Sequence, residues 1–252
     1  MKDRLLTIKE FIDRNGRITL HELENAFPDV SSMTLRRDLT RLEEEGQIIK
    51  ISGGAISVNT VLRAKEADFA ERITFDTEEK HEIAKKAVEI LEPNSCIFID
   101  GGSTTTFFAR ELPDENFYVL TNALTVAETI LRKEKPKVAL LGGDLMKNNF
   151  ITVGKTCIDF AEGINIQTAI MTATGFTGDS GKFTCGSQAQ AEVKRKIIEK
   201  ADNVIMLLGS SKVNKKTPYT FATLSDVNCM VVDKNFPKEL RNKIEQNGVK
   251  IY

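Results

Sequence analysis

The start of the chain places apolar side chains at helical spacing between short polar turns. The apolar positions of the first predicted helix lie three or four residues apart: Leu5, Ile8, Phe11 and Ile12. This helix ends at Asn15-Gly16. Thr19 and Glu22 have the spacing of a capping box, which predicts that a second helix begins there. Pro28-Asp29 then turns the chain toward a third helix.

The third predicted helix has one apolar face and one basic face. Ser31 or Ser32 can cap its first turn, and Gly46 ends it. Its apolar stripe consists of Leu35, Leu39 and Leu42. The side chains outside this stripe are a hydroxyl and three guanidinium groups: Thr34, Arg36, Arg37 and Arg41. We therefore expect the stripe to face a core and the arginines to face solvent.

Two short β-rich runs follow the third helix, at residues 47–51 and 55–58. They are joined across Ser52-Gly53-Gly54, which predicts a hairpin that could lie along DNA phosphates. A helix, a capped helix, a turn, an arginine-bearing helix and a hairpin, in this order, predict a winged helix-turn-helix domain.

Beyond residue 76 the pattern changes to continuous apolar runs that alternate with helical stretches. Strands are predicted at residues 96–99, 117–120, 138–141, 169–171, 204–208 and 230–232. Helices are predicted at residues 105–112, 123–132, 156–161 and 188–201. A further helix has a capped start at Asp76-Thr77-Glu78-Glu79 and ends at Pro93-Asn94. The alternation predicts a mostly parallel sheet that is buried on both faces.

The predicted fold class is therefore α/β, with an N-terminal winged helix-turn-helix followed by a Rossmann-like, mostly parallel sheet domain. The winged domain covers residues 1–58 and the sheet domain covers residues 76–252. Residues 59–75 are rich in charge and poor in apolar side chains, so we interpret them as a linker with a helical middle around residues 62–72.

Composition limits the possible environments of the protein. The 252 residues include 35 basic and 36 acidic side chains, and 41% are hydrophobic, which is ordinary for a globular protein. No apolar run approaches the ~20 residues that span a bilayer, and no signal peptide is visible, so we expect a cytoplasmic location without membrane contact. The four cysteines are scattered, which predicts reduced thiols and no bound metal ion. No cofactor is expected.

The third helix and the hairpin carry chemistry suited to double-stranded DNA, because arginine pairs with guanine edges or phosphates. The candidate DNA-binding residues are Ser32, Thr34, Arg36, Arg37, Arg41, Lys50, Gly53 and Gly54. A basic helix face can also be merely solvated, or can bind a protein. Residues 1–57 carry nine Lys/Arg against ten Asp/Glu, a net charge of −1. Binding would then depend on local arginine clustering and on several copies in a homo-oligomer.

Small and polar residues follow the predicted strands, at the sheet edge where ligands bind. The clearest stretch is residues 100–105, in which two glycines precede three hydroxyls at the start of a helix. This pattern favours a phosphate or carboxylate cradle, although a tight turn with capping hydroxyls has the same composition. Similar groups follow other strands: Thr121-Asn122, Gly142-Gly143-Asp144, Thr174-Gly175 and Gly209-Ser210-Ser211-Lys212. Lys194 and Lys212 could contact an anion or could face solvent.

Both halves of the chain resemble one known family. The segment VSSMTLRRDL, followed by the hairpin glycines, resembles the N-terminal signature of the DeoR-type bacterial transcriptional repressors. The second half has the segments of the DeoR-type effector domain in the expected order: FIDGGSTTTFFARELP, VLTNAL, VALLGGDL, VGKTC, AEVKRKIIEKA and SSK. This resemblance covers nearly the whole chain. It implies that the second domain is related to sugar-phosphate isomerases and senses phosphorylated sugars.

The resemblance also implies an effector site. It assigns the phosphate loop to Asp100, Gly101, Gly102, Ser103, Thr104 and Thr105. It assigns further pocket positions to Thr121, Asn122, Gly143, Lys194 and Lys212. Three residues depart from the family pattern, because Thr174, Gln190 and Gly209 stand where relatives commonly carry an acid. We therefore expect binding without turnover and a ligand preference unlike that of ordinary relatives.

The leading functional hypothesis is a repressor of carbohydrate-metabolism genes. Its first domain would bind an operator, and a phosphorylated sugar or related metabolite would modulate this binding. The alternative is a sugar-phosphate isomerase-like enzyme fused to a regulatory module. That chemistry needs a positioned carboxylate, His or Lys. Because His21 and His81 lie outside the predicted pocket and Thr174 replaces its acid, we expect no enzyme activity.

Overall fold

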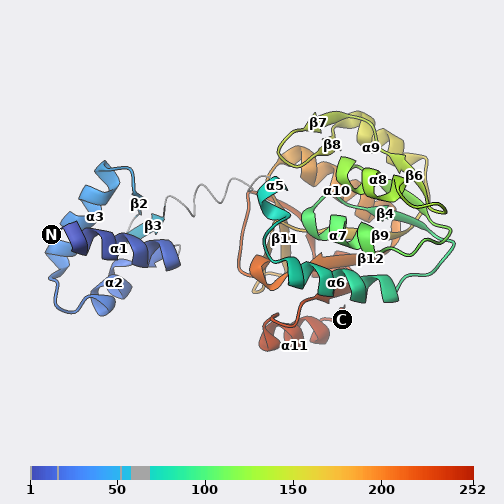
Figure 1. Cartoon of the computed structure of the whole chain (residues 1–252). Coiled ribbons are helices and arrows are strands. Elements are labelled where there is room, and N and C mark those ends of the chain that lie inside the picture. Colours follow the sequence, from blue (N-terminus) through green and yellow to red (C-terminus); the bar gives the residue numbers. More distant parts are fainter. Residues whose placement is uncertain (1, 16, 52, 58–68) are drawn as a thin grey trace. The chain divides into compact units, whose positions relative to one another are not determined.

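The computed structural model describes residues 2–15, 17–51, 53–57 and 69–252 (Figure 1). The chain forms two compact units, Met1–Glu66 and Ala67–Tyr252, each with its own hydrophobic core. The division falls inside the predicted linker. Of the helix predicted around residues 62–72, only α5 (Phe69–Arg72) lies within the described residues. Phe69 is buried, so the second unit begins before the predicted residue 76.

The first unit has the predicted order of elements. Its helices and strands are α1 (Lys2–Asn15), β1 (Arg17–Thr19), α2 (Leu20–Ala26), α3 (Ser32–Glu44), β2 (Ile48–Ile51) and β3 (Gly54–Ser57). The wing is the antiparallel pair β2 and β3. The sequence did not predict β1, which pairs antiparallel with β3 and makes a three-stranded sheet. Three residues are too few to show a strand period.

Capping residues set where α2 and α3 begin, and one apolar stripe packs α3 against the core. Thr19 and Glu22 form the predicted capping box of α2, and the Ser31 hydroxyl accepts a hydrogen bond from the Thr34 N–H at the start of α3. The predicted stripe is buried in the core of the first unit: Leu35, Leu39 and Leu42. Burial of each such side chain contributes about 1.5–3 kcal/mol. The opposite face of α3 is left toward solvent.

The second unit is built on a seven-stranded sheet in which all neighbouring strands are parallel. In spatial order its strands are β15 (Lys250–Ile251), β14 (Cys229–Val232), β12 (Ala201–Leu208), β9 (Ile166–Thr172), β4 (Cys96–Ile99), β5 (Tyr118–Thr121) and β6 (Lys137–Leu140). Each of the six predicted runs overlaps one strand, and β15 is additional. The mostly parallel α/β fold is therefore confirmed.

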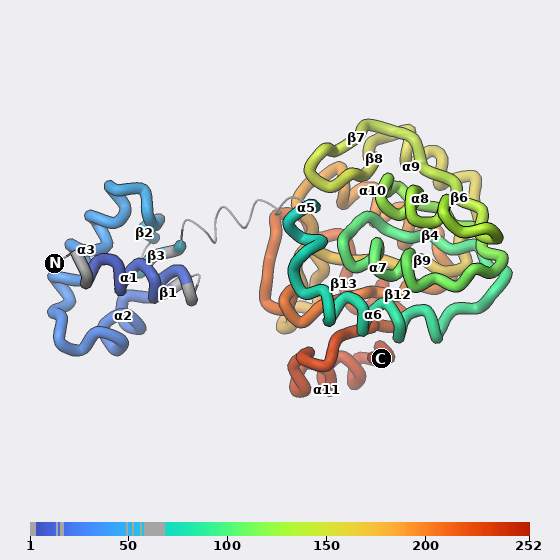
Figure 2. The backbone as a smooth tube through the Cα atoms, viewed as in Figure 1, coloured from blue at the N-terminus to red at the C-terminus, as the bar shows by residue number. Residues whose placement is uncertain are grey.

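Helices cover both faces of this sheet (Figures 1 and 2). On one face α7 packs between the other two helices: α6 (Thr77–Glu89), α7 (Ser103–Glu111) and α8 (Leu124–Leu131). On the other face two helices contact each other: α9 (Lys155–Glu162) and α10 (Gln188–Lys200). The chain winds outward from β4 through β5 to β6, and in the opposite direction from β9 through β12 to β14. The direction switches between β4 and β9, where such sheets bind ligands.

Short antiparallel strands were not predicted. They form a hairpin, β7 (Asp144–Met146) with β8 (Ile151–Val153), and a sheet, β10 (Gly175–Thr177), β11 (Lys182–Cys185) and β13 (Tyr219–Thr223). These strands contain three to five residues, so their periodicity is too brief to identify. The remaining described elements are α11 (Lys238–Gln246) and the 3₁₀ turns Ser210–Lys212 and Leu224–Asp226.

Candidate functional site

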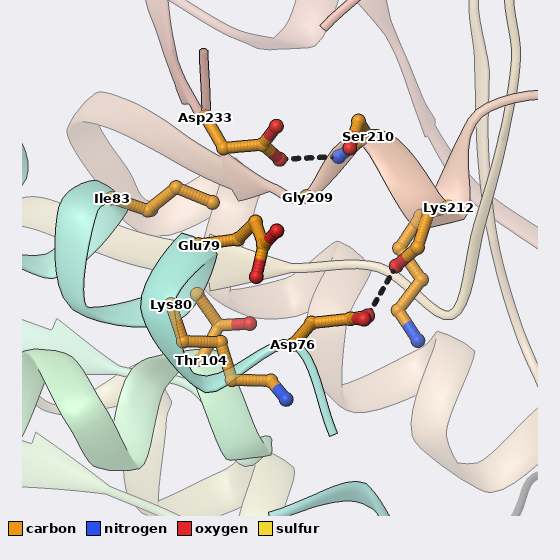
Figure 3. Close-up of a pocket in the computed structure, with 10 residues that line it drawn as sticks. Asp76, Glu79, Lys80, Ile83, Thr104, Gly209, Ser210, Lys212 and Asp233 are labelled. Carbon is orange, nitrogen blue, oxygen red and sulfur yellow. Dashed lines mark hydrogen bonds between the residues drawn. The ribbon is translucent and has the colours of Figure 1, made fainter. Parts of the chain in front are cut away.

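A pocket opens at the carboxyl edge of the sheet in the second unit (Figure 3). It holds about 350 Å³ of space, part of it open to solvent. It is formed by the start of α6, the start of α7 and the segments that follow β12 and β14. Its lining residues are Asp76, Glu79, Lys80, Ile83, Thr104, Gly209, Ser210, Ser211, Lys212 and Asp233. Of the predicted effector residues, Thr104 and Lys212 line this pocket.

The start of α7 presents unused donors. Thr104 is 7% exposed, and its hydroxyl makes no hydrogen bond with any described residue; the Ser103 hydroxyl is also buried and has no such partner. No side chain caps this helix. The Thr105 and Thr106 hydroxyls differ, because both donate to the Gly102 carbonyl. Free N–H groups at a helix start favour an anion.

Two lysines contribute positive charge to the pocket. Burial lowers the pKa of Lys212 to about 8, and the neighbouring Lys215, Arg72 and Lys80 shift it in the same direction. Lys80 is buried, and burial lowers its pKa as well. Its ammonium donates to the carbonyls of Arg72, at 2.8 Å, and Phe75. The sequence did not single out Lys80, because a lysine on a helix is usually solvated.

Three carboxylates also line the pocket, so it is not acid-poor as the replaced family acids suggested. Asp233 is fully buried, and its Oδ2 accepts a hydrogen bond from the Ser210 N–H at 2.6 Å. This oxygen lies 3.7 Å from the position of a Cβ at Gly209, so Asp233 places a carboxylate beside the residue that lacks one. Asp233 directly follows a predicted strand, which is a signal that could have identified it.

Asp76 corrects the prediction of a capped start for α6. Its backbone is left-handed, with φ of 50°, and its side chain caps no helix N–H group. The Asp76 carboxylate instead accepts a hydrogen bond from the Ser211 hydroxyl at 2.7 Å (Figure 3). Asp76, Glu79 and Lys80 share one face of the start of α6. In the sequence these three residues have the pattern of a solvated first turn of a helix.

Asp100 and Lys194 lie at the topological switch point as a buried ion pair. Asp100 Oδ2 also accepts from the Thr172 N–H at 3.1 Å, and the Lys194 ammonium donates to the Thr172 carbonyl at 2.9 Å. The pair thus joins the ends of β4 and β9 to α10. Lys194 does not face solvent, and both charges are already balanced within the protein.

The two glycines of the predicted phosphate loop are required by packing. Neither adopts the left-handed φ that favours glycine, although the chain bends at both residues. A Cβ at Gly101 would overlap the Ile151 side chain, and a Cβ at Gly102 would lie 2.7 Å from Thr172 Cγ2. Both neighbours are close because the loop is sandwiched between β8 and β9.

Three predicted pocket residues hold neighbouring strands together and are absent from the pocket lining. The Thr121 hydroxyl donates to the Ile99 carbonyl at 2.7 Å, and Asn122 Nδ2 donates to the Thr152 carbonyl at 2.9 Å. Asn122 Oδ1 is buried without a partner among the described residues. Gly143 has φ of 140° and packs against the backbone of β8.

The other two positions that depart from the family pattern serve local structure. Gln190 completes a capping box with Ser187, because its Oε1 accepts from the Ser187 N–H at 3.2 Å. An amide can therefore make the contact that a carboxylate would make there. The Thr174 N–H donates to the Thr184 carbonyl at 3.0 Å, which fixes the turn after β9.

The exposed face of α3 in the first unit is the candidate nucleic-acid interface. Arg36 and Arg37 are exposed, and neither guanidinium group makes a hydrogen bond or an ion pair with a described residue. Met33, one turn earlier on the same face, is 82% exposed. Met33 was not predicted as a site residue, because an apolar residue in a helix normally signals burial.

The other basic candidates are partly engaged. Arg41 forms an exposed ion pair with Glu45 at 3.1 Å. The Lys50 ammonium donates to the Thr40 hydroxyl at 2.9 Å, which joins the wing to α3. Arg36 and Arg37 are therefore the more available of the predicted arginines.

The remaining candidates lie at the ends of α3 and the wing. Ser32 is exposed in the first turn of α3, and the Thr34 hydroxyl lies 2.9 Å from that of Ser31. Gly53 is exposed with φ of 80°, a conformation that favours glycine. Gly54 is buried against the backbone of β1, so closely that a Cβ at this position would collide with it.

The described part of the chain was searched for membrane-crossing helices and for groups of metal-binding side chains. None of its helices is long and apolar enough to cross a bilayer. No three His, Cys, Asp or Glu side chains among these residues are grouped so that they could hold a metal ion.

Comparison with known proteins agrees with both units. The regulator GolR of Listeria innocua is 30% identical over 250 residues, which cover 99% of this chain and 97% of its own. The repressor GlcR of Bacillus subtilis is 28% identical, with 99% and 95% covered. The lactose phosphotransferase system repressor of Streptococcus mutans is 30% identical, with 92% of each chain covered. These relatives are named as transcriptional regulators or repressors and not as enzymes.

A more distant likeness is to the solved ribose 5-phosphate isomerase A of Methanocaldococcus jannaschii, with a TM-score of 0.42, 17% identity and 56% of each chain covered. Residues 4–61 match the DeoR-like helix-turn-helix domain, and residues 76–234 match the DeoR C-terminal sensor domain. The chain therefore belongs to the DeoR family of transcriptional regulators and joins an operator-binding unit to a sensor unit for a small molecule.

Proposed function

We propose that this protein represses carbohydrate-metabolism genes and that a phosphorylated metabolite in the pocket controls its binding to an operator. Relatives that are similar over nearly their whole length include repressors whose names refer to sugar uptake. Because operator binding requires access to the chromosome, we place the protein in the cytoplasm.

The Thr104 hydroxyl, which lines the pocket and has no hydrogen-bond partner among the described residues, is the observation that carries the effector proposal. Since no group of the described residues occupies this hydroxyl, it can exchange a hydrogen bond with water for one with a ligand in the pocket. The start of α7 adds free N–H groups and the positive end of a helix dipole. Lys212 and Lys80 add charge on the same pocket. Together these groups suit a phosphate better than a neutral ligand.

The opposite wall of the pocket suits the rest of a sugar. Asp76 and Glu79 present carboxylate oxygens, which accept hydrogen bonds from hydroxyl groups. A phosphate near Thr104 and a polyol near α6 would fill the pocket with matched partners. The alternative function, a sugar-phosphate isomerase-like enzyme fused to a regulatory module, has less support, because the relatives are named as regulators.

Calorimetry on wild type and Thr104→Asp tests the effector proposal. Sugars are titrated in pairs, with and without phosphate. We expect only the phosphorylated member to bind, and we expect Thr104→Asp to abolish binding because its carboxylate repels the phosphate. An acid in the first turn of a helix is otherwise favourable, so the variant should fold.

Thr104→Val serves as the uncharged comparison, because it removes the hydroxyl at nearly constant volume. It should bind the phosphorylated sugar more weakly than wild type and more tightly than Thr104→Asp. Gel shifts with an operator selected from random DNA should show that Thr104→Asp still binds DNA and no longer responds to the sugar. Equal binding of the neutral sugar, or an unaffected Thr104→Asp, would contradict the proposal.

A further inference from the structure

The helix α5 is the first described element after the connection to the DNA-binding unit, and it is docked on the loop between β7 and β8 (Figure 1). The Phe69 N–H donates to the Asn148 carbonyl at 2.9 Å, and Arg72 Nη2 donates to Asn149 Oδ1 at 2.6 Å. The Phe69 ring meets the Phe150 ring edge to face, with centroids 5.9 Å apart. The place where the chain leaves the sensor unit is therefore set by this docking.

Hydrogen bonds from a pocket residue also keep α5 in place. The Lys80 ammonium donates to the carbonyls of Arg72 and Phe75, at the carboxyl end of α5. Lys80 also lines the pocket together with Thr104. Lys80 is thus a buried residue of the pocket lining whose ammonium is hydrogen-bonded to the end of α5; Figure 3 shows it beside Asp76 and Thr104.

The β7–β8 hairpin also contacts the loop that leads into α7. Ile151, directly after Phe150, packs so closely on Gly101 that a Cβ there would overlap it. Asp76, which follows the docked segment, and Phe150, which contacts Phe69, have left-handed backbones with φ of 50° and 52°. Non-glycine residues keep this conformation only where their surroundings hold them, and Asp76 is held by Ser211 in the pocket wall.

We propose that α5 is a latch, which an anion in the pocket opens by drawing the Lys80 ammonium away from the carbonyls of Arg72 and Phe75. A hydrogen bond from an ammonium to a dianion is stronger than one to a neutral carbonyl, so the anion wins this competition. Release of residues 69–75 moves the attachment point of the DNA-binding unit from Phe69 to Asp76. This inference rests on the proposed function only in that the pocket takes an anion.

Amide hydrogen exchange on the full chain, without any ligand, tests whether the Lys80 ammonium keeps residues 69–75 docked. Lys80→Met removes the ammonium at nearly constant volume, and we expect residues 69–75 to exchange at least tenfold faster. Lys86→Met is the matched control, since Lys86 lies on the same helix and also donates to a carbonyl, that of Val232. It should leave residues 69–75 unchanged. Unchanged exchange of residues 69–75 in Lys80→Met would overturn the latch.

Inorganic phosphate is the probe for opening. In wild type we expect phosphate to slow exchange at residues 101–106 and to accelerate it at residues 69–75. Protection at residues 101–106 with unchanged or slower exchange at residues 69–75 would overturn the latch and leave the proposed effector site standing. No protection at residues 101–106 would instead count against the phosphate site, while the Lys80→Met result still decides the latch.

Phe69→Ala is a second variant that tests the latch even if Lys80→Met fails to fold. It weakens the docking on Phe150 and leaves every pocket residue in place. We expect fast exchange at residues 69–75 without phosphate, wild-type protection of residues 101–106 by phosphate, and no further acceleration at residues 69–75. Acceleration by phosphate equal to that of wild type would contradict the latch.

Discussion

Arg36 and Arg37 carry unshared positive charge on α3, whereas Arg41 shares its charge with Glu45. We expect Arg36→Ala and Arg37→Ala each to weaken specific operator binding by about 1–3 kcal/mol, the value of a lost bidentate base contact. Arg41→Ala should weaken it less. Gel shifts at fixed salt measure all three variants. An unchanged affinity of the Arg36→Ala/Arg37→Ala double variant would refute the assignment.

Lys212 should make effector binding depend on pH. With its pKa lowered to about 8, the free ammonium is charged below pH 8 and loses its proton as the pH rises through 8. A bound anion favours the charged form and raises this pKa, so binding takes up a proton above pH 8. Affinity for a phosphorylated sugar should therefore fall as the pH rises above 8.

Calorimetry in two buffers of different ionisation enthalpy would measure this proton uptake. Lys212→Met should abolish the uptake and bind more weakly at neutral pH. Lys216→Met is the control, because Lys216 is exposed in the same segment, lies outside the pocket lining and is not one of the charges that shift the pKa of Lys212. Equal proton uptake by wild type and Lys212→Met would show that another group titrates.

At the scale of elements, the contact of the β4–α7 loop with β8 should be sensitive to a single methyl group. Gly101→Ala places a Cβ inside the Ile151 side chain, so we expect a loss of about 1–3 kcal/mol in the free energy of unfolding of the second unit. Urea denaturation measures it. Gly101→Ala should cost less in a chain that already carries Ile151→Ala, because the obstructing atoms are then absent, and a double-mutant cycle measures the difference.

Gly163→Ala provides the matched control. Gly163 ends α9, and no atom lies within 4 Å of the position of its Cβ. Its free energy of unfolding should therefore stay close to that of wild type. A Gly101→Ala chain as stable as the Gly163→Ala chain would mean that the loop has room to move away from β8.

Elements with a clear period could be predicted from the sequence, and elements without one could not. The α3 stripe and five of the six continuous apolar runs belong to long or largely buried elements, whose pattern reflects one dominant environment; the sixth run forms the edge strand β6, which is only partly buried. The hairpin β7–β8 and the sheet that contains β11 are short and depend on tertiary contacts. Their residues carry no period that a sequence could reveal.

Part of the candidate site could also be predicted from the sequence. Residues that follow a parallel strand, such as Asp100, Thr104 and Lys212, could be found because strand ends meet at one edge. Residues on α6, such as Lys80, reach the pocket only through the packing of a helix that precedes the sheet. Asp100 and Lys194 were named as site residues, and only the structure shows them paired with each other.

At the scale of the whole molecule, charge argues for several copies. A DNA-binding unit with a net charge of −1 over residues 1–57 attracts DNA only through its local arginine cluster. We expect light scattering to find a dimer or larger assembly, and footprinting to find repeated half-sites. A monomer that protects a single half-site tightly at physiological salt would contradict this expectation.

The strand order of the second unit has a consequence for synthesis on the ribosome. The central strand β4 pairs with β9, Ile97 opposite Thr168, so the middle of the sheet cannot close until that later strand has emerged. The helices and wing of the first unit make their contacts within the first 57 residues. We expect the first unit to fold while the second is still being translated. Each new copy then passes through a stage in which it has its DNA-binding fold and no means of responding to a metabolite.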